Sequence, residues 1–99
     1  MENATKTIEL VEKEIVPFMQ FGKEDVLFDP AERKRRAHDI NRATVLGNGY
    51  HGKVEIYFQT ADEELKRVVT TIWDFDQQYI TLKSGSSIPL KAINRIEFF

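Results

Sequence analysis

Residues 66–99, KRVVTTIWDFDQQYITLKSGSSIPLKAINRIEFF, consist of short apolar runs separated by turn-forming residues. The runs are rich in β-branched and aromatic side chains, and the connections contain the aspartate, glycine and serine residues that are typical of tight turns. Pro89 lies in the last run but one, a position typical of a strand end or a sheet edge. This stretch therefore predicts three or four antiparallel strands in a small barrel or a tight sheet.

Another strand is predicted just before this stretch, at residues 54–59. Val54, Ile56 and Phe58 alternate there with more polar residues, which is the pattern of a half-buried strand. The next strand, at about residues 65–74, is apolar on both faces, as expected where a strand bends or where its outer face is covered. The pattern of apolar positions predicts a core made of Ile40, Val54, Ile56, Phe58, Ile72, Ile80, Leu82, Ile88, Leu90, Ile93 and Ile96.

Two helices are predicted before the strands. Residues 5–15 carry apolar side chains at helical spacing. The second helix is expected from about residue 30 to residue 46, with Asp29 as N-cap and Pro30 in the first helical position. Gly47-Asn48-Gly49 then provides residues that accept a positive φ, which predicts the end of this helix.

Taken together, these elements predict an α+β fold, in which one or two N-terminal helices precede a small five-stranded antiparallel β-barrel. This order of elements resembles the SH3-like and Sm-like small barrels. A chain of 99 residues is expected to form a single domain. Within this domain, residues 1–28 are predicted to form an apolar helix and an extended segment. Residues 29–99 are predicted to hold the second helix and the barrel.

The composition is typical of a globular protein, with 41% hydrophobic and 30% charged residues. A net charge of −2 gives no general attraction to nucleic acid or to anionic lipid. The absence of cysteine excludes disulfides and thiolate metal sites, and no cofactor is expected. Neither a secretory signal pattern nor an apolar run long enough to span a membrane is seen, so a cytoplasmic protein without a membrane partner is predicted.

One basic cluster stands out, formed by Arg33-Lys34-Arg35-Arg36 together with Arg42. Consecutive residues of a helix point in directions about 100° apart, so these side chains cannot all face one phosphate backbone. A solvated helix face with local ion pairs is therefore the favoured interpretation. The nucleic-acid alternative would use Arg35, Arg42, Lys83, Lys91 and Tyr79.

Few other side chains indicate chemistry. Trp73, Phe75 and Tyr79 could stack on bases, but aromatic residues in a small sheet more often belong to the core, with Tyr79 the best candidate for an exposed ring. His38 and His51 lack the further ligands that a metal site needs. The serines have no adjacent base to activate them, so an enzyme is not predicted.

Several short stretches are similar to the bacterial Sm-like RNA chaperone family. Phe75-Asp76-Gln77, Leu82-Lys83 and Lys91-Ala92-Ile93 resemble the third strand and the closing segment of that family. The chain departs from the family at Thr70, where the family has a glycine, and at Gln78, where the uridine pocket of the family has a phenylalanine. The resemblance thus implies a small barrel, but it does not imply an intact RNA pocket.

From Asn41 onward the chain also resembles a family of small uncharacterised bacterial proteins with an Sm-like or SH3-like barrel. The resembling stretches are Arg42-Ala43-Thr44-Val45-Leu46-Gly47-Asn48, Thr70-Thr71-Ile72-Trp73 and Ile88-Pro89-Leu90-Lys91-Ala92-Ile93. This resemblance implies the same fold in a bacterial protein and supplies no activity.

The function predicted from the sequence is therefore a non-enzymatic small-barrel module that binds a macromolecular partner or assembles with itself as a dimer or a larger oligomer. The alternative is an Sm-like protein that binds RNA or DNA with its basic helix. An apolar segment with weak periodicity is the candidate oligomer contact, because exposed apolar patches mark interfaces. Its candidate residues are Phe18, Met19, Phe21, Leu27 and Phe28.

Overall fold

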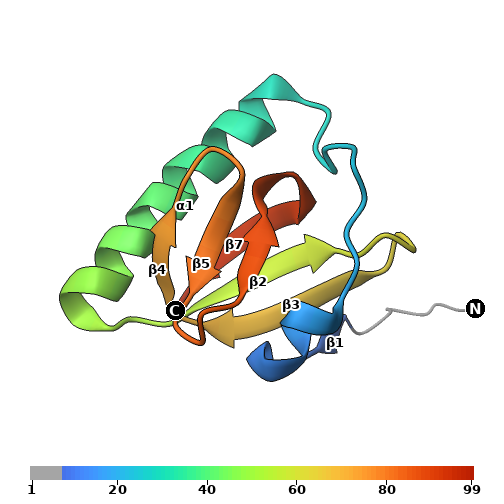
Figure 1. Ribbon diagram of the computed structural model, residues 1–99. Coiled ribbons are helices and arrows are strands. Elements are labelled where there is room, and N and C mark those ends of the chain that lie inside the picture. Colours follow the sequence, from blue (N-terminus) through green and yellow to red (C-terminus); the bar gives the residue numbers. More distant parts are fainter. Residues whose placement is uncertain (1–7) are drawn as a thin grey trace, which may run out of the picture.

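The computed structural model describes residues 8–99, which form an α+β domain with two sheets (Figure 1). The strands pair in the orders β1-β3-β2-β7 and β4-β5-β6, and every pair is antiparallel except β1 with β3. In chain order the elements are β1 (Glu9–Leu10), the 3-10 helix η1 (Lys13–Phe18), α1 (Pro30–Tyr50), β2 (Val54–Gln59), β3 (Leu65–Thr70), β4 (Ile72–Phe75), β5 (Tyr79–Leu82), β6 (Ser87–Pro89), the 3-10 helix η2 (Leu90–Ala92) and β7 (Ile93–Phe98).

The prediction of N-terminal helices followed by a five-stranded SH3-like or Sm-like barrel is wrong. The described residues contain one α-helix, which lies in the middle of the chain, and their seven strands form two sheets that do not close into a barrel. Two helical elements, α1 and η1, each contact a strand of both sheets. Helix α1 contacts β4 of one sheet and β7 of the other, and η1 contacts β3 and β6 (Figure 1).

The helix predicted at residues 5–15 is likewise absent from the part of that range that is described. Residues 5–7 lie outside the described residues, and the rest of the range forms β1 and the start of η1. Val11 donates its backbone N–H to the carbonyl oxygen of Arg67 at 2.9 Å, which continues the pairing of β1 with β3. Val11 and Val16 are both buried in the hydrophobic core, so this segment packs against the rest of the domain although it is not an α-helix.

The start of α1 confirms the predicted cap. Asp29 has an extended backbone, and its Oδ1 accepts the backbone N–H of Ala31 at 3.0 Å. Pro30 follows as the first helical residue, where its missing N–H costs nothing. The buried side of the helix consists of Arg36, Ile40, Ala43, Thr44 and Gly47.

The predicted end of α1 at residues 47–49 is wrong, because the helix continues to Tyr50. The residue that takes the left-handed backbone conformation is His51, with a φ of 54°. Gly47 is needed inside the helix for another reason. A Cβ at this position would lie 2.8 Å from Cγ2 of Thr71 and closer still to the carbonyl oxygen of Ile72, so only glycine lets α1 approach β4 this closely.

The predicted core is confirmed. Of the residues named from the sequence, all are buried except Leu90, which is partly buried and packs against the others. The strand predicted at residues 65–74 bends as its two apolar faces suggested. It leaves the first sheet after Thr70 and enters the second sheet at Ile72, so Val68 and Ile72 both reach the core.

Candidate functional site

The hairpin of β4 and β5 ends in a turn that is fixed by one carboxylate. Oδ1 of Asp76 accepts the backbone N–H groups of Gln78 and Tyr79, at 2.7 Å and 2.8 Å. The backbone N–H of Asp76 donates in turn to the carbonyl oxygen of Tyr79 at 2.9 Å. The two backbone donors lower the pKa of Asp76 below its ordinary value, so this exposed side chain remains charged at neutral pH.

Three aromatic side chains of this hairpin are open to solvent. Trp73 is 45% exposed, Phe75 38% and Tyr79 44%. The expectation of core packing is therefore wrong for Trp73 and Phe75, while the expectation of an exposed Tyr79 is met. The pairing of β4 with β5 shifts register between Ile72 and Asp74, so the inward and outward alternation of a regular strand is interrupted at Trp73. We call Trp73, Asp74, Phe75, Asp76 and Tyr79 the hairpin surface.

Helix α1 supports the hairpin surface from one side. The side-chain amide of Asn48 donates to the carbonyl oxygen of Trp73 at 3.1 Å, so the outer edge of β4 is tied to the helix. Val45 precedes Asn48 by one turn on the same side of α1, and it is also exposed.

Two aromatic rings elsewhere in the molecule are covered by arginines. The guanidinium carbon of Arg42 lies 4.0 Å from the ring centroid of Phe98, and that of Arg95 lies 3.9 Å from the ring centroid of Tyr57. Among the described residues, no cation covers a ring of the hairpin surface in this way. The hairpin rings therefore keep an uncovered face, as do the exposed rings of Phe18, Phe28, Tyr50 and Phe99.

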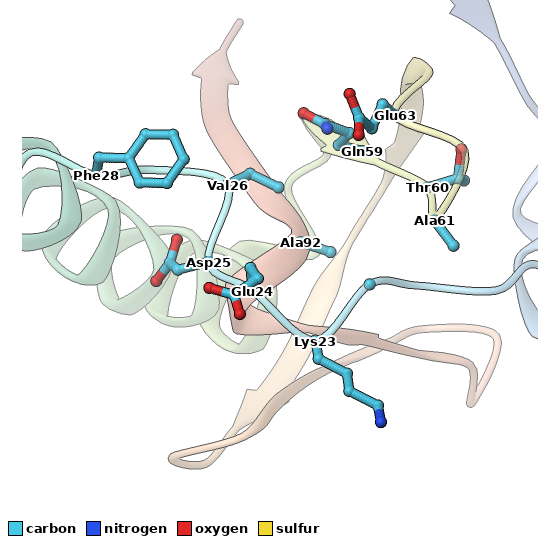
Figure 2. A pocket seen from close by; sticks show the side chains of 11 residues that line it. Lys23, Glu24, Asp25, Val26, Phe28, Gln59, Thr60, Ala61, Glu63 and Ala92 are labelled. Carbon is cyan, nitrogen blue, oxygen red and sulfur yellow. The ribbon is translucent and has the colours of Figure 1, made fainter.

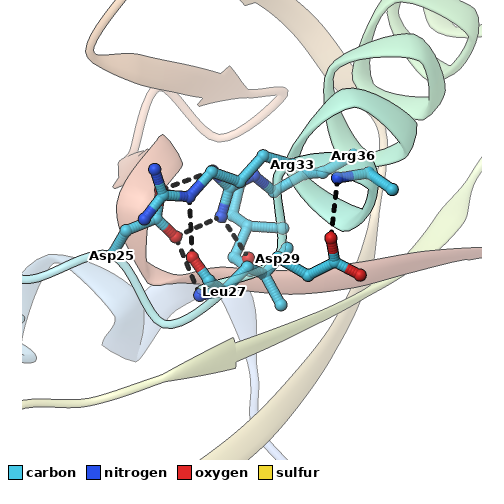
Figure 3. A network of polar contacts seen from close by, with 7 residues as sticks. Asp25, Leu27, Asp29, Arg33 and Arg36 are labelled. Carbon is cyan, nitrogen blue, oxygen red and sulfur yellow. Dashed lines mark hydrogen bonds and ion pairs between the residues drawn. The ribbon is translucent and has the colours of Figure 1, made fainter.

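The basic cluster of α1 is divided among different partners (Figure 3). Arg36 is almost fully buried; its Nη1 and Nη2 donate to the two carboxylate oxygens of Asp25 at 2.9 Å and 2.8 Å, and Nη1 also donates to the carbonyl oxygen of Ile93 at 2.9 Å. Arg33 donates from Nε to the carbonyl oxygen of Leu27 at 2.7 Å. These contacts fasten the segment before α1 to the helix and to β7.

Burial by itself would raise the pKa of Asp25. The hydrogen bonds from Arg36 and from the backbone N–H of Leu27, together with the charges of Arg36 and Arg33, outweigh burial and hold the pKa of this carboxyl below its ordinary value. Sequence reasoning missed this ion pair. Asp25 lies in a segment without clear periodicity, and Arg36 lies in a charge run that looks solvated.

The candidate nucleic-acid contacts lie on several elements. Arg35 is exposed on α1, and Arg42, also on α1, is stacked on a ring. Lys83 follows β5 at the end opposite to Tyr79, and Lys91 lies in η2, just after β6, whose Pro89 pairs with Tyr79. The aromatic candidate therefore belongs to the hairpin surface, whereas the basic candidates are spread over α1, η2 and the connection between β5 and β6.

The candidate oligomer contacts pack in part on their own domain. Leu27 is buried, and Met19 and Phe21 pack against the core, with the rings of Phe21 and Phe58 6.0 Å apart. The two remaining side chains, Phe18 and Phe28, are 85% and 82% exposed. Much of the apolar area that the sequence seemed to leave uncovered is therefore covered within the chain.

A cleft of about 630 Å³ lies between the segment at residues 22–28 and the turn that joins β2 to β3 (Figure 2). Val26 and Ala92 are among its apolar lining residues, and Phe28 also contributes to its wall. Its carboxylates include Asp25, which Arg36 already engages. The cleft is large enough for part of a ligand, but its polar groups do not converge on one point.

Neither a metal site nor a membrane-spanning helix is found among the described residues. Within residues 8–99, no group of three or more histidine, cysteine, aspartate or glutamate side chains is placed to hold a metal ion. No helix of that part of the chain is long and apolar enough to cross a membrane. A comparison with family models, with curated proteins and with solved structures found no match. The resemblances described from the sequence therefore stay predictions.

Proposed function

We propose that this protein is a non-enzymatic module that binds another protein through the hairpin surface. The observation that carries this proposal is the exposure of Trp73, Phe75 and Tyr79 on one hairpin. The turn at Asp76 and the contact of Asn48 with β4 hold the hairpin in place, so the rings are presented in a defined arrangement. Exposed aromatic side chains on a rigid element are typical of the residues that dominate binding energy in protein interfaces.

RNA or DNA binding is the second candidate, since exposed rings can also stack on bases. Charge argues against it. Asp74 and Asp76 place two carboxylates on the same hairpin as the rings and would repel a phosphate backbone. Arg42 is already stacked on Phe98, so part of the basic cluster is engaged within the chain.

Site-specific photo-crosslinking tests the proposal. A photoreactive phenylalanine analogue replaces Phe75 in one variant and Tyr50 in another, and both are expressed in the source cells. Tyr50 is the matched control, because it is an exposed aromatic residue of α1 outside the hairpin surface. We expect the variant at residue 75 to crosslink a protein that the control does not. That protein, once identified and purified, should bind the wild-type chain and should bind Tyr79→Ser on the order of tenfold more weakly or worse.

Three results would contradict the proposal. Crosslinking from both positions to the same proteins would mean that the hairpin has no specific partner. Crosslinking from residue 75 to RNA alone would favour the second candidate. A purified partner that binds Tyr79→Ser and the wild type equally would place its interface elsewhere on the molecule.

A further inference from the structure

Resting on the proposed function, we infer that the partner presents an arginine to the hairpin surface, with its guanidinium over an aromatic ring and paired with Asp74 or Asp76. The inference specifies the chemistry of the occupant, which the proposed function leaves open. It follows from three features of the hairpin: its uncovered rings, its unpaired carboxylate oxygens and the sign of its charge.

The first feature is the open ring faces. Tyr57 and Phe98 each carry an arginine of this chain at about 4 Å from the ring centroid. Trp73 and Tyr79 have no such cation among the described residues, although tryptophan is the aromatic side chain that attracts a cation most strongly. The rings of the hairpin can therefore receive from a partner the guanidinium contact that Tyr57 and Phe98 receive from their own chain.

The second feature is the pair of carboxylates that alternate with Trp73 and Phe75 along the chain. Oδ1 of Asp74 accepts the backbone N–H of Phe75 at 2.8 Å, and Oδ1 of Asp76 holds the turn. Within residues 8–99, Oδ2 of each carboxylate accepts no hydrogen bond and neither side chain forms an ion pair. Each carboxylate thus has a free oxygen for an incoming guanidinium donor.

The third feature is the acidic character of the stretch that carries the turn. The five residues from Trp73 to Gln77 include two acidic side chains and no basic one. A guanidinium satisfies the rings and the carboxylates together, because it is planar, positively charged and able to donate several hydrogen bonds. An anionic occupant, such as a phosphate, would gain the stacking but would meet repulsion from both carboxylates.

The test uses the full-length protein and a pair of blocked pentapeptides, Gly-Leu-Arg-Leu-Gly and the same peptide with citrulline in place of arginine. Citrulline keeps the planar shape of the side chain and removes its charge. Trp73 is the only tryptophan of the chain, so its fluorescence reports on the hairpin directly. We expect the arginine peptide to change the emission of Trp73, to shift the amide resonances of residues 73–79 and to bind at least about fivefold more tightly than the citrulline peptide.

Two double variants make the test specific for the carboxylates. Asp74→Asn with Asp76→Asn keeps the Oδ1 acceptors of the turn and removes both charges, so we expect the two peptides to bind this variant with similar affinity. Glu12→Gln with Glu14→Gln removes two carboxylates at and beside η1, outside the hairpin surface, and should leave the preference for arginine unchanged. The amide spectrum of each variant shows whether the fold is intact.

The inference is overturned if neither peptide binds below about 5 mM, if both bind the wild type equally, or if the shifted resonances lie outside the hairpin. It is also overturned if a single-stranded oligouridylate binds residues 73–79 more tightly than the arginine peptide does. If the crosslinked partner depends on Tyr79 while the two peptides bind alike, the proposed function stands and this inference falls. If no partner depends on the hairpin, the proposed function itself falls.

Discussion

Replacing Gly47 by alanine should destabilise this protein, although alanine is the better helix former. Inside a helix the exchange is worth about 1 kcal/mol in favour of alanine. Here the added Cβ would lie 2.8 Å from Cγ2 of Thr71 and closer still to the carbonyl oxygen of Ile72. The carbonyl belongs to the backbone of β4, so it cannot move aside as a flexible side chain would. Overpacking of this kind costs about 1–3 kcal/mol, and a backbone contact places it near the upper end. The expected net loss is about 2 kcal/mol.

Gly49→Ala provides the matched control in the same helix. A Cβ at Gly49 would meet no atom within 4 Å, so only the helix propensity changes. Urea denaturation followed by circular dichroism should therefore show Gly49→Ala unchanged or more stable by up to about 1 kcal/mol, and Gly47→Ala less stable. A Gly47→Ala variant as stable as the wild type would mean that α1 does not lie against β4 as closely as described.

Other residues make separate predictions. Asp25→Asn should lower the free energy of unfolding by about 1–3 kcal/mol at neutral pH, because Arg36 loses a charged acceptor. The pKa of Asp25 is below its ordinary value of 3.8 in the folded protein, so the advantage of the wild type should be constant above about pH 5 and should shrink as the pH falls below about 4; a difference as large at pH 2 as at pH 7 would contradict the ion pair. Asp29→Ala should cost about 0.5–2 kcal/mol in urea melts, and an unchanged midpoint would show that this cap contributes nothing. Ile56→Ala should cost about 2–5 kcal/mol and the exposed control Val45→Ala less than about 0.5 kcal/mol; similar values for both would refute the assigned faces of β2 and α1.

The features that the sequence predicted correctly depend on local rules. The alternation of Val54, Ile56 and Phe58 fixes which side chains of β2 face inward, whatever the rest of the chain does. Asp29 and Pro30 likewise determine the start of α1 through contacts within one turn. For these reasons the core and the start of the helix were predicted, although the arrangement of the sheets was not.

The features that were missed depend on contacts between distant segments. Whether the sheets close into a barrel depends on what lies against β4 and β7, and here α1 contacts both. Gly47 looks like a helix stop in the sequence, but it serves as a contact point with Ile72 and Thr71. The charge run around Arg36 is typical of a solvated helix face, but in the folded chain Arg36 is paired with Asp25. No periodicity records such pairings.

The exposure of Trp73 and Phe75 was missed for a related reason. Strand alternation predicts the orientation of a side chain only while the register is regular, and the shift between Ile72 and Asp74 breaks it at Trp73. Aromatic residues in a small sheet more often belong to the core, so the sequence predicts burial for both of these rings. The sequence alone does carry one signal for exposure, namely the two aspartates that alternate with the aromatic residues from Trp73 to Asp76.

The contact between α1 and the hairpin predicts that a substitution in the helix, which alters none of the rings, should change binding. The side chain of Asn48 donates to the backbone carbonyl oxygen of Trp73, so it restrains the edge of β4. This hydrogen bond involves the backbone of Trp73 and not its ring. A rigid binding element loses less conformational entropy when its partner arrives, and this raises affinity. Asn48→Ala should therefore weaken binding of the arginine peptide severalfold while the amide spectrum keeps the pattern of the folded protein. Equal affinity of this variant and the wild type would show that pairing with β5 and the turn at Asp76 are enough to order the hairpin.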